Sequence, residues 1–412
     1  MPEIYTMLDR YKKLLRSIFQ KMKLNLLTNK VKFIPLDELP YQEVIIEGNG
    51  NEVCYSPIYN NEEPFSDSYN NVDIKLYELN NVYANINSSS FLNTDKNTAY
   101  IETFPYLKND KANYASGHLL AHDDHVAYFK ITKVKSVNRF DRLLFLGGNG
   151  SFNFYHWLVE IAPKLLCLNN ELLLKYKIST IVVNDKVRDI ENYQWILQQC
   201  LSHLTDIKVL YSNQDESLYA EKLYFINTFN QTVFNYSKPK KIPSISTIYN
   251  KRIINTLSER LISANLIKIE EELPSKIFIL RNDQAVSSFN KRSYNQNEIF
   301  DYFKEQGFIG IYPDKLSISE QITIFKNANF IVGPSGSGWA NLIFAQPGTR
   351  AISWLPKSAQ FFDTYSMLAA ILEINMRFTV YSTQINDDIH SSYKLSVSTL
   401  RALYESMLVD LQ

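Results

Sequence analysis

The second half of the chain alternates between short apolar runs and amphipathic segments. Five apolar runs have the length and the Ile, Val and Phe content of buried strands, at 276–280, 308–311, 329–332, 350–354 and 377–380. Between them, apolar positions recur at helical spacing over 297–306, 317–326 and 361–372. Such alternation is typical of a parallel sheet that is covered by helices on both faces.

A shorter alternating unit precedes it. The pattern predicts strands at 143–146, 180–183, 207–210 and 223–226, with a helix over 189–201. Residues 41–145 are rich in Asn, Ser and Tyr, and there we expect short strands at 43–47, 74–79 and 126–131. The sequence therefore predicts an α/β protein with two Rossmann-like domains that face each other across a cleft, and with a strand-rich start to the first domain.

We expect four parts along the chain. Residues 1–40 hold an N-terminal basic helix, and residues 41–245 form the first domain, which ends in a polar linker that contains a KPKK run. Residues 246–390 form the second domain, which opens with a helix over 251–265. Residues 391–412 form a C-terminal helix, predicted at 397–411, that crosses back to the first domain.

The basic segment at 4–27 allows two interpretations. Its apolar residues recur at helical spacing, and six cations make it basic: Arg10, Lys12, Lys13, Arg16, Lys21 and Lys23. Such a helix can lie on an anionic membrane, which would give a peripheral contact through residues 1–30. It can also pack on its own domain with a solvated basic face, which is the commoner arrangement.

Composition narrows the class of protein. The 412 residues include 43 Lys+Arg and 43 Asp+Glu, so no overall field attracts nucleic acid. The three cysteines show no CxxC spacing, which favours a reducing compartment. No apolar run approaches the roughly 18 residues of a membrane-spanning helix, and no signal peptide is visible. We expect a cytoplasmic protein, with the inner membrane face as the one open alternative.

A glycine-containing turn follows the apolar run 329–332. The letters PSGSG occupy 334–338, and an apolar segment at 339–344 comes next, which predicts strand, tight loop and short helix. The first N–H groups of a helix lack intrahelical acceptors and lie at its positive end, so they bind phosphate readily. Glycine lets a ligand approach the backbone closely. The alternative is a strand-to-helix turn without a ligand, and the pattern alone does not decide.

A second glycine loop at 147–150 leads into a predicted helix that begins near Ser151 or Asn153. His156 and Glu160 stand four residues apart and therefore share one helix face near the loop, which suits acid/base chemistry. The alternative is a packed histidine and an acid that is favoured by the helix dipole. Three other histidines cluster at 118, 122 and 125 and could bind a metal, but their spacing matches no metal-ligand scheme, so we favour exposed loop histidines and expect no metal site.

Several motifs occur in a fixed order. They read FYHWLVE at 154–160, IFILR at 277–281, KRSYNQNE at 291–298, GF at 307–308, EQ at 320–321 and GPSGSGWAN at 333–341. In this order they resemble glycosyltransferase family 61. The resemblance covers roughly 145–165 and 275–356, and the N-terminal third of the chain lies outside it.

The resemblance implies a GT-B-type, inverting transferase that uses a nucleotide sugar and needs neither a metal nor another cofactor. Arg281 and Arg292 would then bind the diphosphate, Tyr312 would flank the base, and Glu320 would hold the ribose hydroxyls. The loop would complete the donor site through Ser335, Gly336, Ser337, Gly338, Trp339 and Asn341. Ser335 stands where the family has His, and Trp339 stands where it has Leu. Trp339 either stacks on the donor or fills the core, and we favour the core.

An inverting transfer needs a base on the acceptor hydroxyl, opposite the leaving group. Glu160 is our preferred base, with His156 orienting it or the acceptor, and the reverse assignment stays open. The expected acceptor is a hydroxyl of a cell-envelope, capsular or other glycan, free or lipid-linked. The altered loop residue Ser335 motivates an alternative, a non-catalytic nucleotide- or glycan-binding protein on the same fold. A third alternative is another phosphate chemistry, because fold does not fix function.

Overall fold

The structure of the chain is a computed structural model that describes residues 28–59, 65–93, 95–106, 112–130, 137–233, 245–266, 272–282, 292–383 and 391–409. The basic segment 4–27 lies outside the described residues. Within them, no helix has the length and apolar character needed to cross a membrane.

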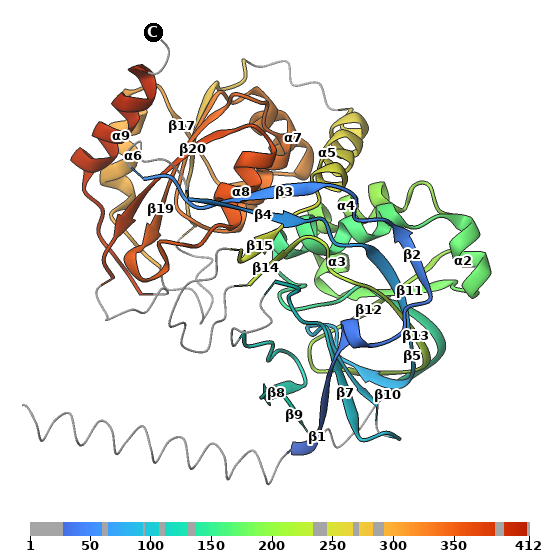
Figure 1. Cartoon of the computed structure of the whole chain (residues 1–412). Helices are drawn as coiled ribbons and strands as arrows, with labels where there is room; N and C mark the ends of the chain where they lie inside the picture. Colours follow the sequence, from blue (N-terminus) through green and yellow to red (C-terminus); the bar gives the residue numbers. More distant parts are fainter. Residues whose placement is uncertain are drawn as a thin grey trace, which may run out of the picture.

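The chain forms two lobes, each around its own large sheet (Figure 1). The first lobe holds an eleven-stranded sheet in the order β12-β11-β10-β13-β5-β6-β7-β1-β9-β8, with β2 paired to β5. Its strands are β1 (Thr28–Pro35), β2 (Glu43–Ile46), β5 (Ile74–Ala84), β6 (Ser90–Asn93), β7 (Thr98–Ile101), β8 (Leu119–His122), β9 (Val126–Lys130), β10 (Val137–Phe145), β11 (Thr180–Asn184), β12 (Lys208–Ser212) and β13 (Ser217–Ile226).

This first sheet is mixed rather than fully parallel. β12, β11, β10 and β13 run parallel to one another, as the alternating pattern predicted. The strands from β13 to β7 pair in antiparallel fashion, so the strand-rich start of the chain extends the sheet rather than forming a separate layer. The helical segments of this lobe are η2 (His156–Ile161), η3 (Ala162–Cys167), α2 (Asn170–Tyr176), α3 (Lys186–Asp189) and α4 (Glu191–Leu201).

The second lobe holds five parallel strands in the order β17-β16-β18-β19-β20. They are β16 (Lys276–Ile279), β17 (Ile309–Ile311), β18 (Phe330–Val332), β19 (Arg350–Pro356) and β20 (Asn375–Tyr381). The helices that alternate with these strands are α6 (Gln296–Glu305), α7 (Ile318–Asn327), the 3-10 helix η6 (Ser337–Phe344) and α8 (Thr364–Ile371). The parallel α/β alternation predicted for this region is confirmed.

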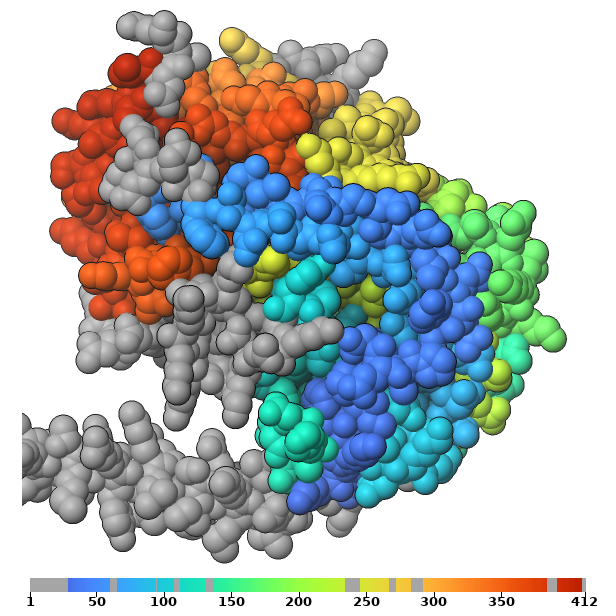
Figure 2. All heavy atoms as spheres, in the orientation of Figure 1, coloured from blue at the N-terminus to red at the C-terminus, as the bar shows by residue number. Residues whose placement is uncertain are grey.

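Three segments cross-connect the lobes. Helix α5 (Lys251–Ala264) contacts α4 of the first lobe and η6 of the second. The hairpin β3 (Asn51–Tyr55) and β4 (Ser66–Asn70) lies along α8 (Figure 1), and Tyr59 bridges to Phe378 of β20. The pair β14 (Gln231–Thr232) and β15 (Thr247–Ile248) also contacts α8. In Figure 2 the blue hairpin residues span the surface from one lobe to the other.

The observed parts differ from the predicted ones at three places. Residues 28–35, which we assigned to the N-terminal helical part, form β1 between β7 and β9. Residues 51–59 pack on the second lobe although they belong to the sequence range of the first. The C-terminal helix α9 (Val397–Val409) does not cross back, because its buried Leu400, Tyr404 and Met407 complete the core of the second lobe beside α6.

The apolar core is continuous between the lobes. One cluster of buried side chains includes Trp157 from the first lobe, Leu257 from α5 and Trp339 from the second lobe, all without exposed surface. The three described cysteines are free and buried. A shared core fixes the end of β18 and the helix η2 in one frame.

Candidate active site

His156 and Glu160 lie in η2, a π-helix rather than the α-helix we expected. In i→i+5 winding a turn takes roughly four to five residues, so side chains four apart lie almost in line. The His156 Nδ1 and the Glu160 Oε2 are 2.6 Å apart. The second carboxylate oxygen, Oε1, accepts the Thr232 amide at 3.2 Å. Both oxygens of Glu160 are thus engaged, and the imidazole orientation is fixed from one side.

The glycine loop before this helix positions the imidazole. Gly150 has a φ of 77°, and a Cβ there would come within 2.3 Å of the His156 ring. The loop therefore requires glycine at this position both for its backbone and for the packing. Asn153 begins the helix, since its side chain accepts the Tyr155 amide at 2.9 Å and its carbonyl accepts the Trp157 amide. Of the two starts that the sequence offered, Asn153 is the one observed.

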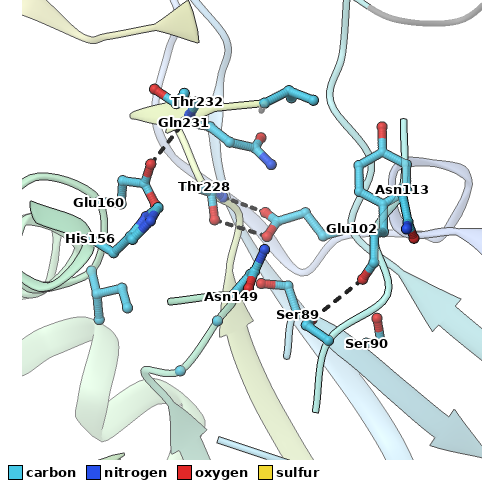
Figure 3. A pocket seen from close by; sticks show the side chains of 16 residues that line it. Ser89, Ser90, Glu102, Asn113, Asn149, His156, Glu160, Thr228, Gln231 and Thr232 are labelled. Carbon is cyan, nitrogen blue, oxygen red and sulfur yellow. Dashed lines mark hydrogen bonds and ion pairs between the residues drawn. The ribbon is translucent and has the colours of Figure 1, made fainter. Parts of the chain in front are cut away.

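A pocket opens in front of this pair (Figure 3). It holds about 700 Å³ of space that is partly open to solvent. Besides His156 and Glu160, its polar lining comes from loops and strand ends far apart in the sequence, namely Ser89, Ser90, Glu102, Asn113, Tyr114, Ser116, Asn149, Thr228, Gln231 and Thr232. The arrangement brings a hydrogen-bonded acid/base pair to the edge of a polar cavity.

Sequence reasoning missed Glu102 and Thr228. Glu102 is 7% exposed, and its carboxylate accepts the Thr228 amide and hydroxyl. Each of the two residues follows the apolar run of a strand, β7 or β13, closely. A polar residue just after a buried strand is a recognisable signal, but nothing in the pattern indicates that these two strands lie in one sheet.

The glycine turn of the second lobe lies at a topological switch point. β16 and β18 are neighbours, while β17, which comes between them in the sequence, pairs on the other side of β16. In open α/β sheets ligands bind outside the carboxyl ends of strands that diverge in this way. Arg281 follows β16 and the loop 333–338 follows β18, so both predicted donor elements lie at this edge.

Contacts tie Arg281 to the loop. Its Nη2 donates to the Ser335 carbonyl at 2.5 Å, and its Nη1 donates to the Arg292 carbonyl at 2.9 Å. Within the described part of the chain, Arg281 forms no salt bridge with a carboxylate. A Cβ on Gly336 would stand 3.8 Å from its Nη2, so the turn and the guanidinium are adjacent. Arg281, the Arg292 carbonyl, Ser335 and Gly336 therefore lie together, and their contact with a donor stays a prediction.

The second predicted cation, Arg292, is largely buried. Burial lowers the pKa of Arg292, and the neighbouring charge of Arg281 lowers it further. Two guanidinium groups that repel each other are stabilised by an anion placed between them. The same pair acts on the buried hydroxyl of Tyr365, whose pKa is raised by burial and lowered in part by both arginines.

Two tyrosines connect this cationic end with the His156–Glu160 pair. The ring of Tyr365 lies edge-on to Tyr155 at 6.0 Å, and the ring of Tyr155 lies edge-on to His156 at 5.3 Å. Burial raises the pKa of Tyr155 strongly, and the charge of Glu160 adds to the effect. The His156 ring therefore contacts a pair of packed tyrosines, and the charges of both arginines reach the hydroxyl of the second of them.

The remaining predicted donor residues have structural partners. Glu320 forms a capping box at the start of α7: its Oε2 accepts the Ser317 amide and hydroxyl, both at 2.7 Å. Tyr312 is half-buried at the end of β17, with Lys315 over its ring at 4.5 Å. Ser337 and Gly338 begin η6, and this helix is of the 3-10 type. A ribose or base contact by Glu320 or Tyr312 stays a prediction.

Two residues predicted for the donor site are buried in the core, which is the position that we favoured for Trp339 but not for Asn341. Trp339 has no exposed surface, and its indole N–H donates to the Pro334 carbonyl at 2.9 Å. Asn341 is equally buried, and its amide donates to Gln321 at 2.8 Å and to the Gly338 carbonyl at 3.2 Å. Both side chains brace the loop from the core side rather than facing a ligand.

The histidine cluster of the first lobe is spread over separate contacts. The His118 Nε2 lies 3.3 Å from the Asn85 amide, the His122 Nε2 accepts the Tyr114 amide at 2.9 Å, and His125 is exposed. Among the described residues, no group of three His, Cys, Asp or Glu side chains is arranged to hold a metal ion.

Comparison with protein families identifies a match over the region that holds these residues. Residues 154–352 match the family described as Glycosyltransferase 61. The matched range begins just before His156 and ends after the loop at 333–338, so it contains the acid/base pair, both arginines and the glycine turn. Among curated proteins, none matches the chain.

Proposed function

Because this chain belongs to glycosyltransferase family 61, we propose that it transfers a sugar from a nucleotide sugar to a hydroxyl of a glycan, with inversion at the anomeric carbon. The observation that carries the proposal is the pair of tyrosines that links the arginines at the switch point with the hydrogen-bonded His156 and Glu160. The end with the arginines suits an anionic group of the donor, and the end with His156 and Glu160 suits proton transfer.

The donor diphosphate binds at the edge formed by Arg281, Arg292 and the turn 335–338. Departure of a nucleoside diphosphate develops negative charge, which guanidinium groups and N–H groups at a helix start stabilise. The supporting geometry is the contact of Arg281 with the Ser335 carbonyl, which holds the cation against the turn. Ser335, which stands in place of the family's His, offers the phosphate a neutral hydroxyl. In this proposal the two guanidinium groups neutralise the charge that develops on the diphosphate, and no metal ion is required.

His156 takes the proton of the acceptor hydroxyl. The sequence slightly favoured Glu160 as the base, but its Oε2 lies 2.6 Å from the His156 Nδ1, so we assign the base to the imidazole that this carboxylate orients. When Nδ1 donates to Glu160, the lone pair of the imidazole is on Nε2, which is the arrangement of an oriented general base. Glu160 then stabilises the imidazolium that forms.

The acceptor binds in the polar pocket in front of His156, where hydroxyl and amide side chains match the hydroxyls of a sugar. We extend the proposal to a cell-envelope or capsular glycan, free or lipid-linked, handled in the cytoplasm or at the inner membrane face. The basic sequence of residues 1–30 supports a peripheral membrane contact. A second candidate function is a non-catalytic nucleotide- or glycan-binding protein, for which the substitution of serine for the family's His at position 335 is the specific observation.

A thermal-shift screen with nucleotides and nucleotide sugars, in the presence of a chelator, tests the donor half. A donor at 100 times its Kd is expected to stabilise the chain by about 2.7 kcal/mol. Arg281→Ala is expected to weaken donor binding roughly 10-fold or more, because a charge-assisted contact is lost. Arg188→Ala, at an exposed side chain of α3, is the matched control and keeps the wild-type shift.

Each variant is compared with its own unliganded melting temperature, so that lost packing is separated from lost binding. No shift with any nucleotide, or equal shifts in Arg281→Ala and the wild type, would remove the donor site from the proposal.

A further inference from the structure

The pocket holds a second carboxylate that the proton transfer does not use. Figure 3 shows Glu102 across the opening from His156 and Glu160, with its carboxylate turned toward Thr228. Its Oε1 accepts the Thr228 amide at 2.5 Å, and its Oε2 accepts the Thr228 hydroxyl at 2.8 Å. A carboxylate oxygen has a second lone pair, so each can still accept a hydrogen bond from a ligand.

A buried lysine supports this carboxylate from behind. Lys164 is 1% exposed, and its Nζ donates to the Thr228 hydroxyl at 2.9 Å and to the Ile226 carbonyl at 2.8 Å. Burial lowers the pKa of Lys164, while the charges of Glu102 and Glu160 raise it. The hydrogen bonds from Lys164 to Thr228 and from Thr228 to Glu102 hold the carboxylate in one orientation. They also place the lysine amine on the side of Thr228 that faces away from the pocket.

With His156 neutral, as the proposed base must be before the transfer, the pocket keeps a net negative charge whether or not Lys164 is protonated. Among the described residues that line it, the anionic side chains are Glu102 and Glu160, and none carries a fixed positive charge. One buried cation offsets at most one of the two carboxylates. The rest of the lining offers hydroxyls and amides, which pair with neutral hydroxyls without a charge preference.

We propose that Glu102 selects the acceptor by charge: it accepts a hydrogen bond from a hydroxyl or ammonium group of the acceptor sugar and disfavours sugars that carry a carboxylate or phosphate. This inference rests on the proposed function, since it assigns the pocket to the acceptor. Like charges brought together in a partly buried site oppose binding, whereas an ammonium group gains a charge-assisted contact.

Saturation-transfer NMR with three probes measures this selection directly on the full chain. The probes are methyl β-glucoside, its 2-amino-2-deoxy analogue and methyl β-glucuronide. We expect the wild type to bind the amino sugar roughly 10-fold or more tightly than the glucuronide, with the glucoside between them. Glu102→Gln is nearly isosteric, keeps an oxygen for Thr228 and is expected to reduce this ratio to about 3 or less. Glu171→Gln, at an exposed side chain of α2, keeps the wild-type ratio.

Three results would overturn the inference: an unchanged ratio in Glu102→Gln, tightest binding of the glucuronide by the wild type, or binding of none of the probes. The donor thermal shift in the wild type does not involve this pocket. A normal donor shift with no acceptor selection therefore refutes the role of Glu102 alone, and a missing donor shift refutes the proposed function.

Discussion

At the scale of single residues, Asp363 joins the two lobes through a buried network. Its Oδ1 accepts the Thr247 hydroxyl at 2.6 Å, and its Oδ2 accepts the Ser246 hydroxyl at 2.7 Å and the Cys54 thiol at 3.3 Å. Burial raises the pKa of this carboxyl above the ordinary value of 3.8, and the three donors offset only part of the rise. The protonated form is therefore favoured more in the folded chain than in the unfolded chain.

This shift predicts how stability depends on pH. A carboxyl whose pKa is raised on folding stabilises the fold fully below its unfolded pKa, and this contribution is lost as pH rises through the folded pKa. The melting temperature of the wild type, measured relative to Asp363→Asn from pH 4 to pH 8, should accordingly be highest at the acid end. Asp215→Asn, in an exposed loop, should show no such trend. A wild-type advantage that grows with rising pH would contradict the assignment.

At the scale of elements, the start of α7 is fixed from both lobes. Ser317 and Glu320 form the capping box, and Asn192 of α4 accepts the Ile318 amide at 2.7 Å and donates to the Leu316 carbonyl at 2.9 Å. A helix start that is capped by its own residues and held by a neighbouring helix orients the strand that follows it. That strand is β18, which leads directly into the glycine turn.

The capping assignment predicts a stability effect. Ser317→Ala is expected to lower the free energy of unfolding by about 1 kcal/mol, because the Glu320 amide loses its acceptor. Urea titration measures the loss, and Ser319→Ala, on the first turn but outside the box, is the matched control. Equal stabilities of the two variants would show that the box contributes nothing.

The long periodic elements were predictable, and the exceptions have physical reasons. α5, α6 and the strands of the second lobe carry clear periods, and the structure places them within a few residues of the predicted bounds. The π-winding at His156 was not predictable, because α- and π-helices share nearly the same apolar pattern. β1 was assigned to the N-terminal helical part although Val31 and Phe33 alternate with Lys30 and Lys32, because the run is short and follows directly on a basic segment. Glu102 was missed because its partner Thr228 lies 126 residues away and no motif connects the two.

At the scale of the whole molecule, the arginine cluster of the second lobe and the His156–Glu160 pair of the first lobe pack against one apolar core. Arg281 follows β16 of the parallel sheet and contacts the Arg292 carbonyl, whereas the His156–Glu160 pair lies in η2, which follows β10 of the mixed sheet. Tyr155 and Tyr365 pack between them, and the apolar cluster around Trp157 and Trp339 continues beneath. The residues that we propose for the donor and for the proton transfer are therefore positioned by the same packing, as the proposed single-displacement transfer requires.

The most direct test of this account is the rate of nucleoside diphosphate release from a nucleotide-sugar panel, with glycan acceptors and a chelator present. The wild type and the exposed-site control His125→Ala are predicted to consume a donor. His156→Ala and Glu160→Gln are predicted to be at least ~100-fold slower while their donor-induced thermal shifts persist, because they lose the oriented base and not the phosphate contacts. Unchanged turnover in both variants, or no donor consumed by the wild type, would contradict the account.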